Sequence, residues 1–203
     1  MHAIALVDYD NVRDRNRPER FHPVRADHEL WATDLVSDVT LAFRRALPDL
    51  VELDLRFYGG WIAENGRWSP SAEWLLPLVA SLRGRKHGIL VRPVLAATMT
   101  QFPLVNLRGT IRLQSRKRRQ KMVDGMLGFD ALHFARNAAP PLGILGIVSD
   151  DDDMIPALLT AHDANAAHTI WLRKRAVGSG LNDAALQRHG VSIHSLGKDP
   201  SSR

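Results

Sequence analysis

A chain of 203 residues, of which 45% are hydrophobic and 24% charged, has the composition of a globular protein and the length of one well-packed domain. The sequence contains no cysteine, which excludes disulfide bonds, thiolate metal ligands and cysteine nucleophiles. The formal net charge of +5 makes nucleic acid a candidate partner. No apolar run approaches the roughly 20 residues of a membrane-spanning helix, so we expect a cytoplasmic protein with no membrane partner.

The first half of the chain alternates between apolar runs and stretches with helical periodicity. Residues 3–7 form the first predicted strand, which ends at Asp8, and residues 13–28 are expected to form a long surface loop. A helix follows, with an apolar face made of Leu30, Leu35, Val39, Ala42, Phe43 and Ala46. The second predicted strand covers residues 51–58, and residues 59–70 form the second predicted loop. The next helix has an apolar face made of Trp74, Leu75, Leu78, Val79 and Leu82.

The second half continues this alternation. Residues 88–97 form the third predicted strand, and the helix after it has an apolar stripe made of Met122, Met126, Phe129 and His133. Residues 142–148 form a strand that ends at Ser149 and four consecutive aspartates, and residues 169–172 form the last strand. This alternation predicts an α/β fold, a three-layer α/β/α sandwich around a mostly parallel sheet of about five strands. One domain is expected over residues 1–197, with a frayed tail at residues 198–203.

Acidic residues gather where the predicted strands end. Asp8 follows the first strand, residues 150–153 follow the strand at 142–148, and Asp124 lies early in the third helix. Ligands of open α/β sheets bind at the carboxyl ends of the strands, so we expect these carboxylates to share one site. Their mutual repulsion favours a hard divalent cation, and oxygen ligands suit Mg²⁺ or Mn²⁺. One or two of the four aspartates are expected to cap the helix that begins near Met154, and the alternative to metal binding is that the run serves capping alone.

Three segments resemble the motifs of one nuclease family. They are VDYDNV at residues 7–12, KMVDGMLGFD at residues 121–130 and SDDDDMIPAL at residues 149–158. In this order and spacing, the chain resembles an NYN domain of the PIN-like nuclease superfamily over residues 1 to about 194. The resemblance implies a PIN-like fold and an Mg²⁺- or Mn²⁺-dependent ribonuclease that hydrolyses RNA phosphodiester bonds and leaves a 5′ phosphate.

Carried over residue by residue, the resemblance implies a set of catalytic, metal-binding acids, namely Asp8, Asp124, Asp151 and Asp153. Asn11 would support them through its side-chain amide. Asp130 also matches the motif, but it lies about a turn and a half beyond Asp124, so a supporting or structural role is expected. Asp150 stands where the family usually has glycine, which leaves open which two of the four consecutive aspartates bind metal.

A run of basic residues lies directly before the helix of Asp124. Residues 112–121 include six basic residues and no acid. They are expected to follow a phosphate backbone across the mouth of the acidic site, and a solvated basic surface is the alternative. The residues expected to bind RNA are Lys121, Arg118, Arg119, Lys117 and Arg116, together with Arg13 in the first loop. Trp61 and Trp68 have the ring type that stacks on unpaired bases, but we expect both to pack on the domain surface.

Two other functions compete with the ribonuclease. Asp8-Tyr9-Asp10 is also an Asp-x-Asp motif after a strand, as in a haloacid-dehalogenase-like phosphatase, where Asp8 would be the nucleophile and Asp10 its acid–base partner. That function explains neither Asn11 nor the basic run. The second competitor is a non-catalytic RNA-binding regulatory domain, which keeps the fold without the chemistry. The sequence leaves open whether DNA is also cut and whether the chain forms a homodimer.

Overall fold

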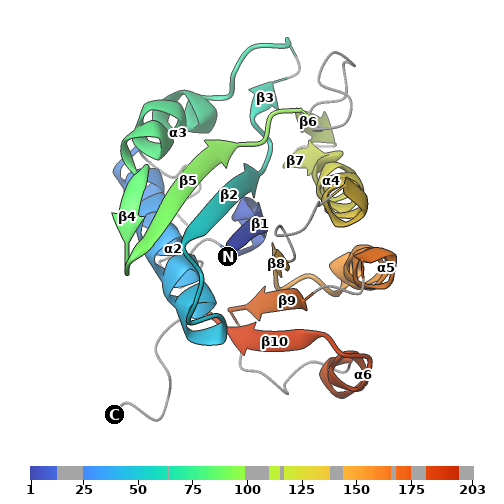
Figure 1. Cartoon of the computed structure of the whole chain (residues 1–203). Helices are drawn as coiled ribbons and strands as arrows, with labels where there is room; N and C mark the ends of the chain where they lie inside the picture. The colour runs from blue at the N-terminus through green and yellow to red at the C-terminus, as the bar shows by residue number, and fades with distance from the viewer. Residues whose placement is uncertain are drawn as a thin grey trace.

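A seven-stranded sheet forms the centre of the computed structural model, with the strand order β10-β9-β8-β1-β2-β5-β4 (Figure 1). The structure describes residues 1–12, 25–63, 65–98, 110–114, 117–137, 144–165, 168–174 and 182–196. The strands are β1 (His2–Asp8), β2 (Glu52–Tyr58), β4 (Gly84–Lys86), β5 (Ile89–Leu95), β8 (Ile144–Val148), β9 (His168–Arg173) and β10 (Ser192–Ser195). All neighbouring strands are parallel except β4, which pairs antiparallel with β5. The parallel strands therefore share one carboxyl end.

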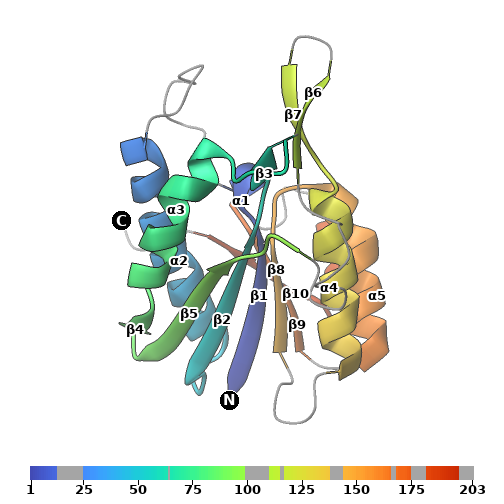
Figure 2. The same ribbon diagram turned by 90° about the horizontal axis from the view of Figure 1, so that it is seen from above.

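Helices cover both faces of this sheet, which gives three layers (Figure 2). The helices α2 (Arg25–Ala46) and α3 (Pro70–Ser81) lie on one face, and α4 (Val123–Asn137), α5 (Ile155–Asn165) and α6 (Asp183–Arg188) lie on the other. The short helix α1 (Tyr9–Val12) follows β1, and the 3₁₀ turn η1 (Asp152–Met154) follows β8. The predicted α/β architecture is confirmed. No helix in the described residues is both long enough and apolar enough to cross a bilayer.

The central strands are buried on both sides, which explains their nearly continuous apolar sequences. Every residue of β8 is buried, and so is every residue of β1 after His2. Ala3 and Val7 of β1 pack with the layer of α2 and α3, whereas Ile4 and Leu6 pack with the layer of α4 and α5. By contrast, β2 alternates between buried and half-buried residues along most of its length. The core is therefore deepest around β1 and β8, whose ends carry the predicted acids.

The structure has more strands than the sequence predicted. All five predicted strands are present, but β4 and β10 at the two edges of the sheet were missed. Their sequences, GRK and SIHS, are short and lack an apolar run, because edge strands bury less surface than central ones. The prediction also missed a second sheet with the order β3-β6-β7, which comprises β3 (Ile62–Ala63), β6 (Thr110–Gln114) and β7 (Lys117–Lys121).

Parts of both predicted loops form regular structure. Because α2 begins at Arg25, the predicted loop over residues 13–28 is wrong at its end. The rest of that loop and the predicted tail at residues 198–203 lie outside the described residues. The second loop includes β3 and ends at Ser69, whose hydroxyl accepts a hydrogen bond from the N–H of Ala72 at 3.3 Å. This N-cap and the proline that follows it fix the start of α3.

Two predicted apolar faces are wrong at individual residues. Leu30 of α2 is 36% exposed and Phe129 of α4 is 59% exposed. The helix α4 packs on the sheet and on α5 together, since a Cβ added at Gly128 would lie 3.3 Å from Cβ of Ala157. Met122 precedes the helix with a φ of 66°, so it does not belong to the helical face. The buried residues of α4 are Val123, Met126, Leu127, Asp130, Ala131 and Ala135.

The close contact between β8 and α2 gives a test of this packing. A Cβ added at Gly146 would lie 2.3 Å from Cζ of Phe43, which is fully buried and has no room to move. We expect Gly146→Ala to lower the free energy of unfolding by about 1–3 kcal/mol in urea denaturation, because overpacking strains a dense core. The matched control is Gly125→Ala in α4, where nothing lies within 4 Å of the added atom. That change should stabilise the protein by up to about 1 kcal/mol. Unchanged stability in Gly146→Ala would contradict the packing of α2 on β8.

Candidate functional site

Asp8 is buried at the carboxyl end of β1, the central strand of the sheet. The residue is 2% exposed. Its Oδ2 accepts a hydrogen bond of 3.2 Å from the hydroxyl of Ser149, the first residue after β8. Its Oδ1 is also buried and has no hydrogen-bond partner among the described residues. Within the described part of the chain, Asp8 therefore has a buried acceptor oxygen without a partner.

The surroundings of Asp8 disfavour its negative charge. Burial, followed by repulsion from Asp124, raises the pKa of Asp8 from 3.8 to about 7. The charge of Asp10 contributes to this rise as well, whereas the hydroxyl of Ser149 and the backbone of Asn11 oppose it. A nearby cation would offset both the burial and the repulsion. The electrostatics of the site thus favour a positive charge beside Asp8.

Asp124 connects the acid of β1 with the acids that follow β8. It lies in the first turn of α4 and is exposed to solvent on one side. Partial burial raises the pKa of Asp124, and so do the negative charges of Asp151 and Asp153. Asp124 in turn repels Asp8. Electrostatic repulsion therefore links the four acids that the resemblance implied.

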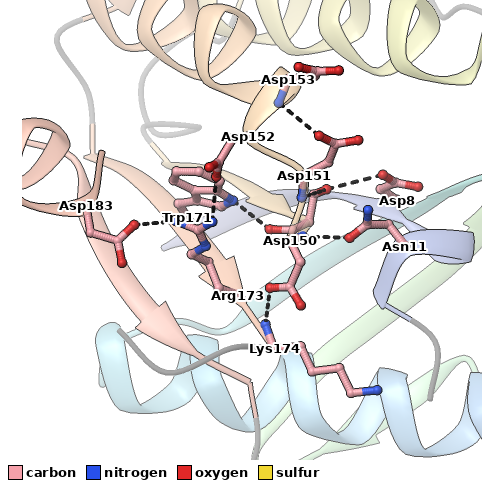
Figure 3. Close-up of polar contacts among 11 residues, drawn as sticks. Asp8, Asn11, Asp150, Asp151, Asp152, Asp153, Trp171, Arg173, Lys174 and Asp183 are labelled. Atoms are coloured by element: carbon pink, nitrogen blue, oxygen red, sulfur yellow. Dashed lines mark hydrogen bonds and ion pairs between the residues drawn. The ribbon is translucent and has the colours of Figure 1, made fainter. Parts of the chain in front are cut away.

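Two of the four consecutive aspartates contact β9 and the residue after it. Asp150 Oδ1 accepts a hydrogen bond from the backbone N–H of Lys174 at 2.8 Å. Asp152 Oδ1 forms an ion pair with Nη2 of Arg173 at 2.6 Å. Figure 3 shows these two carboxylates directed toward Lys174 and Arg173. Each contact occupies an oxygen that would otherwise be open to a metal ion.

Asp151 and Asp153 are the two members of the run that act on Asp124. Asp151 Oδ1 accepts the backbone N–H of Asp153 at 3.0 Å and so caps η1, and its own N–H donates to Ser149 Oγ at 3.1 Å. The predicted capping role is therefore confirmed for Asp151. Asp153 is exposed. Capping and metal binding are compatible at Asp151, because a carboxylate has two acceptor oxygens.

Asn11 supports the site through the backbone of the aspartate turn. Its Oδ1 accepts the N–H of Asp150 at 2.7 Å, across 139 positions of sequence. The backbone N–H of Asn11 also acts on Asp8, since it lowers the pKa of that carboxyl. Asn11 therefore joins the turn after β1 to the turn after β8 and fixes the two sets of acids relative to each other.

The acids suit a hard divalent cation by their chemistry. Carboxylates are the ligands that Mg²⁺ and Mn²⁺ prefer, and Asp8 offers a buried Oδ1 without a hydrogen-bond partner in the described structure. Within the described part of the chain, no three acidic or histidine side chains lie close enough to enclose an ion. A cation at this place would keep several of its water ligands, as Mg²⁺ usually does.

Asp130, the other acid of the α4 motif, serves the structure. Its carboxylate is fully buried, and its Oδ2 accepts a hydrogen bond from the hydroxyl of Tyr58 at 2.6 Å. Arg56 Nη2 lies 3.6 Å from the same oxygen. These contacts tie α4 to β2, which agrees with the structural role expected from its spacing to Asp124.

The predicted basic run forms the hairpin of β6 and β7, which extends beyond the carboxyl end of the main sheet (Figure 2). In this hairpin Arg112 pairs with Arg119. Lys121 is the last residue of β7, and α4 begins two residues later, so the hairpin leads directly into the helix that carries Asp124. Arg116 and Arg13, also predicted to bind RNA, lie outside the described residues.

The two tryptophans of the second predicted loop differ in exposure. Trp61 is buried, and its Nε1 donates a hydrogen bond to the carbonyl of Phe57 at 2.9 Å, so its predicted packing is confirmed. Trp68 is 39% exposed and lines an open pocket together with Arg67 and Glu73. Packing therefore accounts for only part of the Trp68 surface.

Two residues of β9 hold the aspartate turn and were not predicted from the sequence. Arg173 is fully buried at the end of β9, and Trp171 Nε1 donates to the carbonyl of Ser149 at 2.8 Å. A basic residue at the end of the apolar segment HTIWLR was the available signal. The partners of Arg173, Asp152 and Asp183, lie in other segments, so the sequence alone did not show what this arginine binds.

Comparison of the chain with protein-family models, with curated proteins and with solved structures finds no match. The geometry of the acidic turn and of the adjacent hairpin carries the functional argument.

The raised pKa of Asp8 predicts how stability depends on pH without metal. Between pH 4 and pH 7 the folded protein retains a proton on Asp8 that the unfolded chain has released, so stability falls as pH rises through this window. The loss is up to about 4 kcal/mol. Asp8→Asn has no such proton, so we expect it to be more stable than the parent at pH 8 and similar at pH 4.

Urea unfolding at both pH values, in the presence of a chelator, measures this difference. Asp49→Asn, which changes an exposed carboxylate in the turn after α2, is the control and should follow the parent protein at both pH values. Parallel pH curves for the parent and Asp8→Asn would show that Asp8 has an ordinary pKa.

Proposed function

We propose that the chain is a metal-dependent ribonuclease with a PIN-like fold, whose metal ligands are Asp8, Asp124, Asp151 and Asp153. The observation that carries this proposal is the carboxylate of Asp8, which is buried at the end of the central strand with one oxygen unpaired in the described structure. Repulsion from Asp124 adds to the cost of its charge, and Mg²⁺ or Mn²⁺ would remove that cost. The resemblance of the three acidic segments to an NYN domain supports the same function.

The protein's own residues hold the carboxylates in place before any substrate binds. Ser149 donates to the carboxylate of Asp8 and accepts from the backbone N–H of Asp151, so a single hydroxyl joins Asp8 to the aspartate turn. Asn11 fixes the turn from the side of β1. The bound ion would lower the pKa of a water molecule and neutralise charge on the phosphodiester. Acids that are already oriented need little reorganisation during the reaction.

The hairpin of β6 and β7 is the proposed contact for the RNA backbone. Arg112 pairs with Arg119, and Lys117 and Lys121 lie two positions to either side of Arg119. In a two-stranded ribbon, residues that pair across the strands lie on the same face, and so does every second residue along each strand. These four basic positions therefore share a face. Arg118, also predicted from the sequence to bind RNA, pairs with Leu113 and so occupies a position on the opposite face. A row of basic positions beside an acidic metal site suits a polyanion that is cut at that site.

The proposal predicts that two single substitutions abolish cleavage. Asp8→Asn and Asp124→Asn each remove a negative charge from the proposed ligand set with little change in side-chain size. We expect each to reduce Mg²⁺- or Mn²⁺-dependent cleavage of single-stranded RNA by about 100-fold or more. Asp49→Asn, on the surface away from the sheet end, should retain full activity.

Circular dichroism should show native folding in all three variants, and purification must exclude contaminating nucleases. Full activity in both site variants would reject the proposal.

Release of phosphate from a monoester, without RNA cleavage, would support the phosphatase alternative. Metal-independent RNA binding without cleavage would support the regulatory domain. Single-stranded DNA, assayed in parallel, shows whether a 2′-hydroxyl is needed.

The hairpin register predicts a difference between neighbouring arginines. Arg112→Ala/Arg119→Ala removes two charges from the proposed RNA-binding face and should weaken RNA binding. We expect the slope of log affinity against log salt to become shallower by about 1.4, the value for two lost contacts with single-stranded nucleic acid. Fluorescence anisotropy at several salt concentrations measures this slope.

Arg118→Ala is the matched control, since it removes a charge from the same hairpin but from the opposite face. It should change the slope much less than Arg119→Ala alone. Equal effects of the two single substitutions would mean that the hairpin attracts RNA by its total charge and that no particular face binds it.

A further inference from the structure

Arg173 is a fully buried cation near the site with two carboxylate partners. Its side chain is fully buried at the end of β9 (Figure 3). One arm of the guanidinium forms an ion pair with Asp183 of α6, and the other forms an ion pair of 2.6 Å with Asp152 of η1. Its guanidinium carbon lies 4.0 Å from the centre of the Trp171 ring. Arg173 therefore connects three parts of the chain through one buried cation.

These contacts divide between an inner and an outer partner. Asp183 is buried like Arg173 itself, whereas the Asp152 side chain is 38% exposed. A buried guanidinium requires a buried counter-charge, and Asp183 supplies it. The bond to Asp152 is therefore not needed to keep Arg173 charged. Its effect is on the turn, because it fixes the middle of the four-aspartate run against β9.

Fixing Asp152 determines where its two neighbours lie. Asp151 and Asp153 flank it, and both act on Asp124 electrostatically. The turn between them is a single 3₁₀ turn of three residues, held by the cap from Asp151 to the N–H of Asp153. So short a turn has few internal hydrogen bonds, and an outside anchor at Asp152 limits its rotation. Trp171, stacked on Arg173, also holds the carbonyl of Ser149, whose hydroxyl binds Asp8.

We propose that Arg173 is a positioning residue of the acidic site, which uses Asp152 as an anchor so that Asp151 and Asp153 face Asp124 in a fixed geometry. The inference rests on the proposed function, because it assigns these two acids to metal binding. It also divides the run by role: Asp152 anchors the turn, whereas Asp151 and Asp153 bind the ion. Arg173 itself touches neither ion nor RNA.

The contrast between two substitutions of Asp152 tests this division. Asp152→Ala removes the anchor, whereas Asp152→Asn keeps an oxygen that accepts a hydrogen bond from Arg173. We expect Mn²⁺ affinity of the full-length protein, measured by isothermal titration calorimetry, to fall about tenfold in Asp152→Ala. Asp152→Asn should bind Mn²⁺ nearly as well as the parent. If Asp152 were itself a ligand, the loss of its charge would weaken both variants alike, which would overturn the proposal.

A third variant tests the arginine directly. Arg173→Lys keeps the buried charge beside Asp183, but an ammonium lacks the planar fork that reaches two carboxylates at once. It should lower Mn²⁺ affinity to about the level of Asp152→Ala. Should Arg173→Lys fail to fold, the two Asp152 variants still decide the question, since Asp152 is partly exposed. The matched control is Asp163→Ala, which removes an acid that pairs with His189 at 3.1 Å near the other end of α5, and it should leave the affinity unchanged.

A purely structural role gives a different pattern of results. It would lower the melting temperature of Asp152→Ala and leave the Mn²⁺ affinity of the folded protein unchanged, which would overturn the positioning role. The parent protein separates this inference from the proposed function. If the parent neither binds Mn²⁺ nor cuts RNA, the proposed function fails and this inference fails with it. If the parent does both and Asp152→Ala binds Mn²⁺ equally well, only the positioning role fails.

Discussion

At the end of β1 a carboxylate lies in the interior of the protein with another acid close enough to repel it. Burial and repulsion both act against the charge of Asp8, and the surrounding structure only partly offsets them, through hydrogen bonds from Ser149 and the Asn11 backbone. A carboxylate in such a place lowers stability at neutral pH unless a cation joins it. The other contacts at the carboxyl end of the sheet surround this unfavourably placed carboxylate.

The surrounding contacts hold the acids together from several directions. Asn11 binds the turn after β8 from the side of β1, and Arg173 binds the same turn from the side of β9. Ser149, between them, links Asp8 and Asp151 through its hydroxyl. Each contact joins segments that are distant in sequence, so the arrangement exists only when the sheet is assembled. Such cross-links oppose the repulsion between the like charges of these segments.

Negative and positive residues occupy different elements at the carboxyl end of the sheet. The acids lie at the ends of strands that are buried on both faces, whereas the basic residues lie on a hairpin that extends past the sheet. The helix α4 begins directly after the hairpin, so one continuous segment supplies basic positions and then Asp124. A polyanion drawn to the hairpin would thus lie on the segment that leads into Asp124, whose own negative charge repels it. The proposed phosphodiesterase function draws on this pairing of opposite charges.

The amino-acid sequence alone determined the alternating α/β pattern, the central strands and the identity of the acids. These features depend on local periodicity: buried strands read as apolar runs, and polar residues follow directly where the strands end. It did not determine the short edge strands or the hairpin, whose sequences lack an apolar run. Only the tertiary structure decided that Asp8 is buried, that Asp130 binds Tyr58 and that Asp152 is held by Arg173. The reason is that burial and pairing depend on partners that are distant in the chain, 72 positions away for Asp130, and sequence spacing does not specify them.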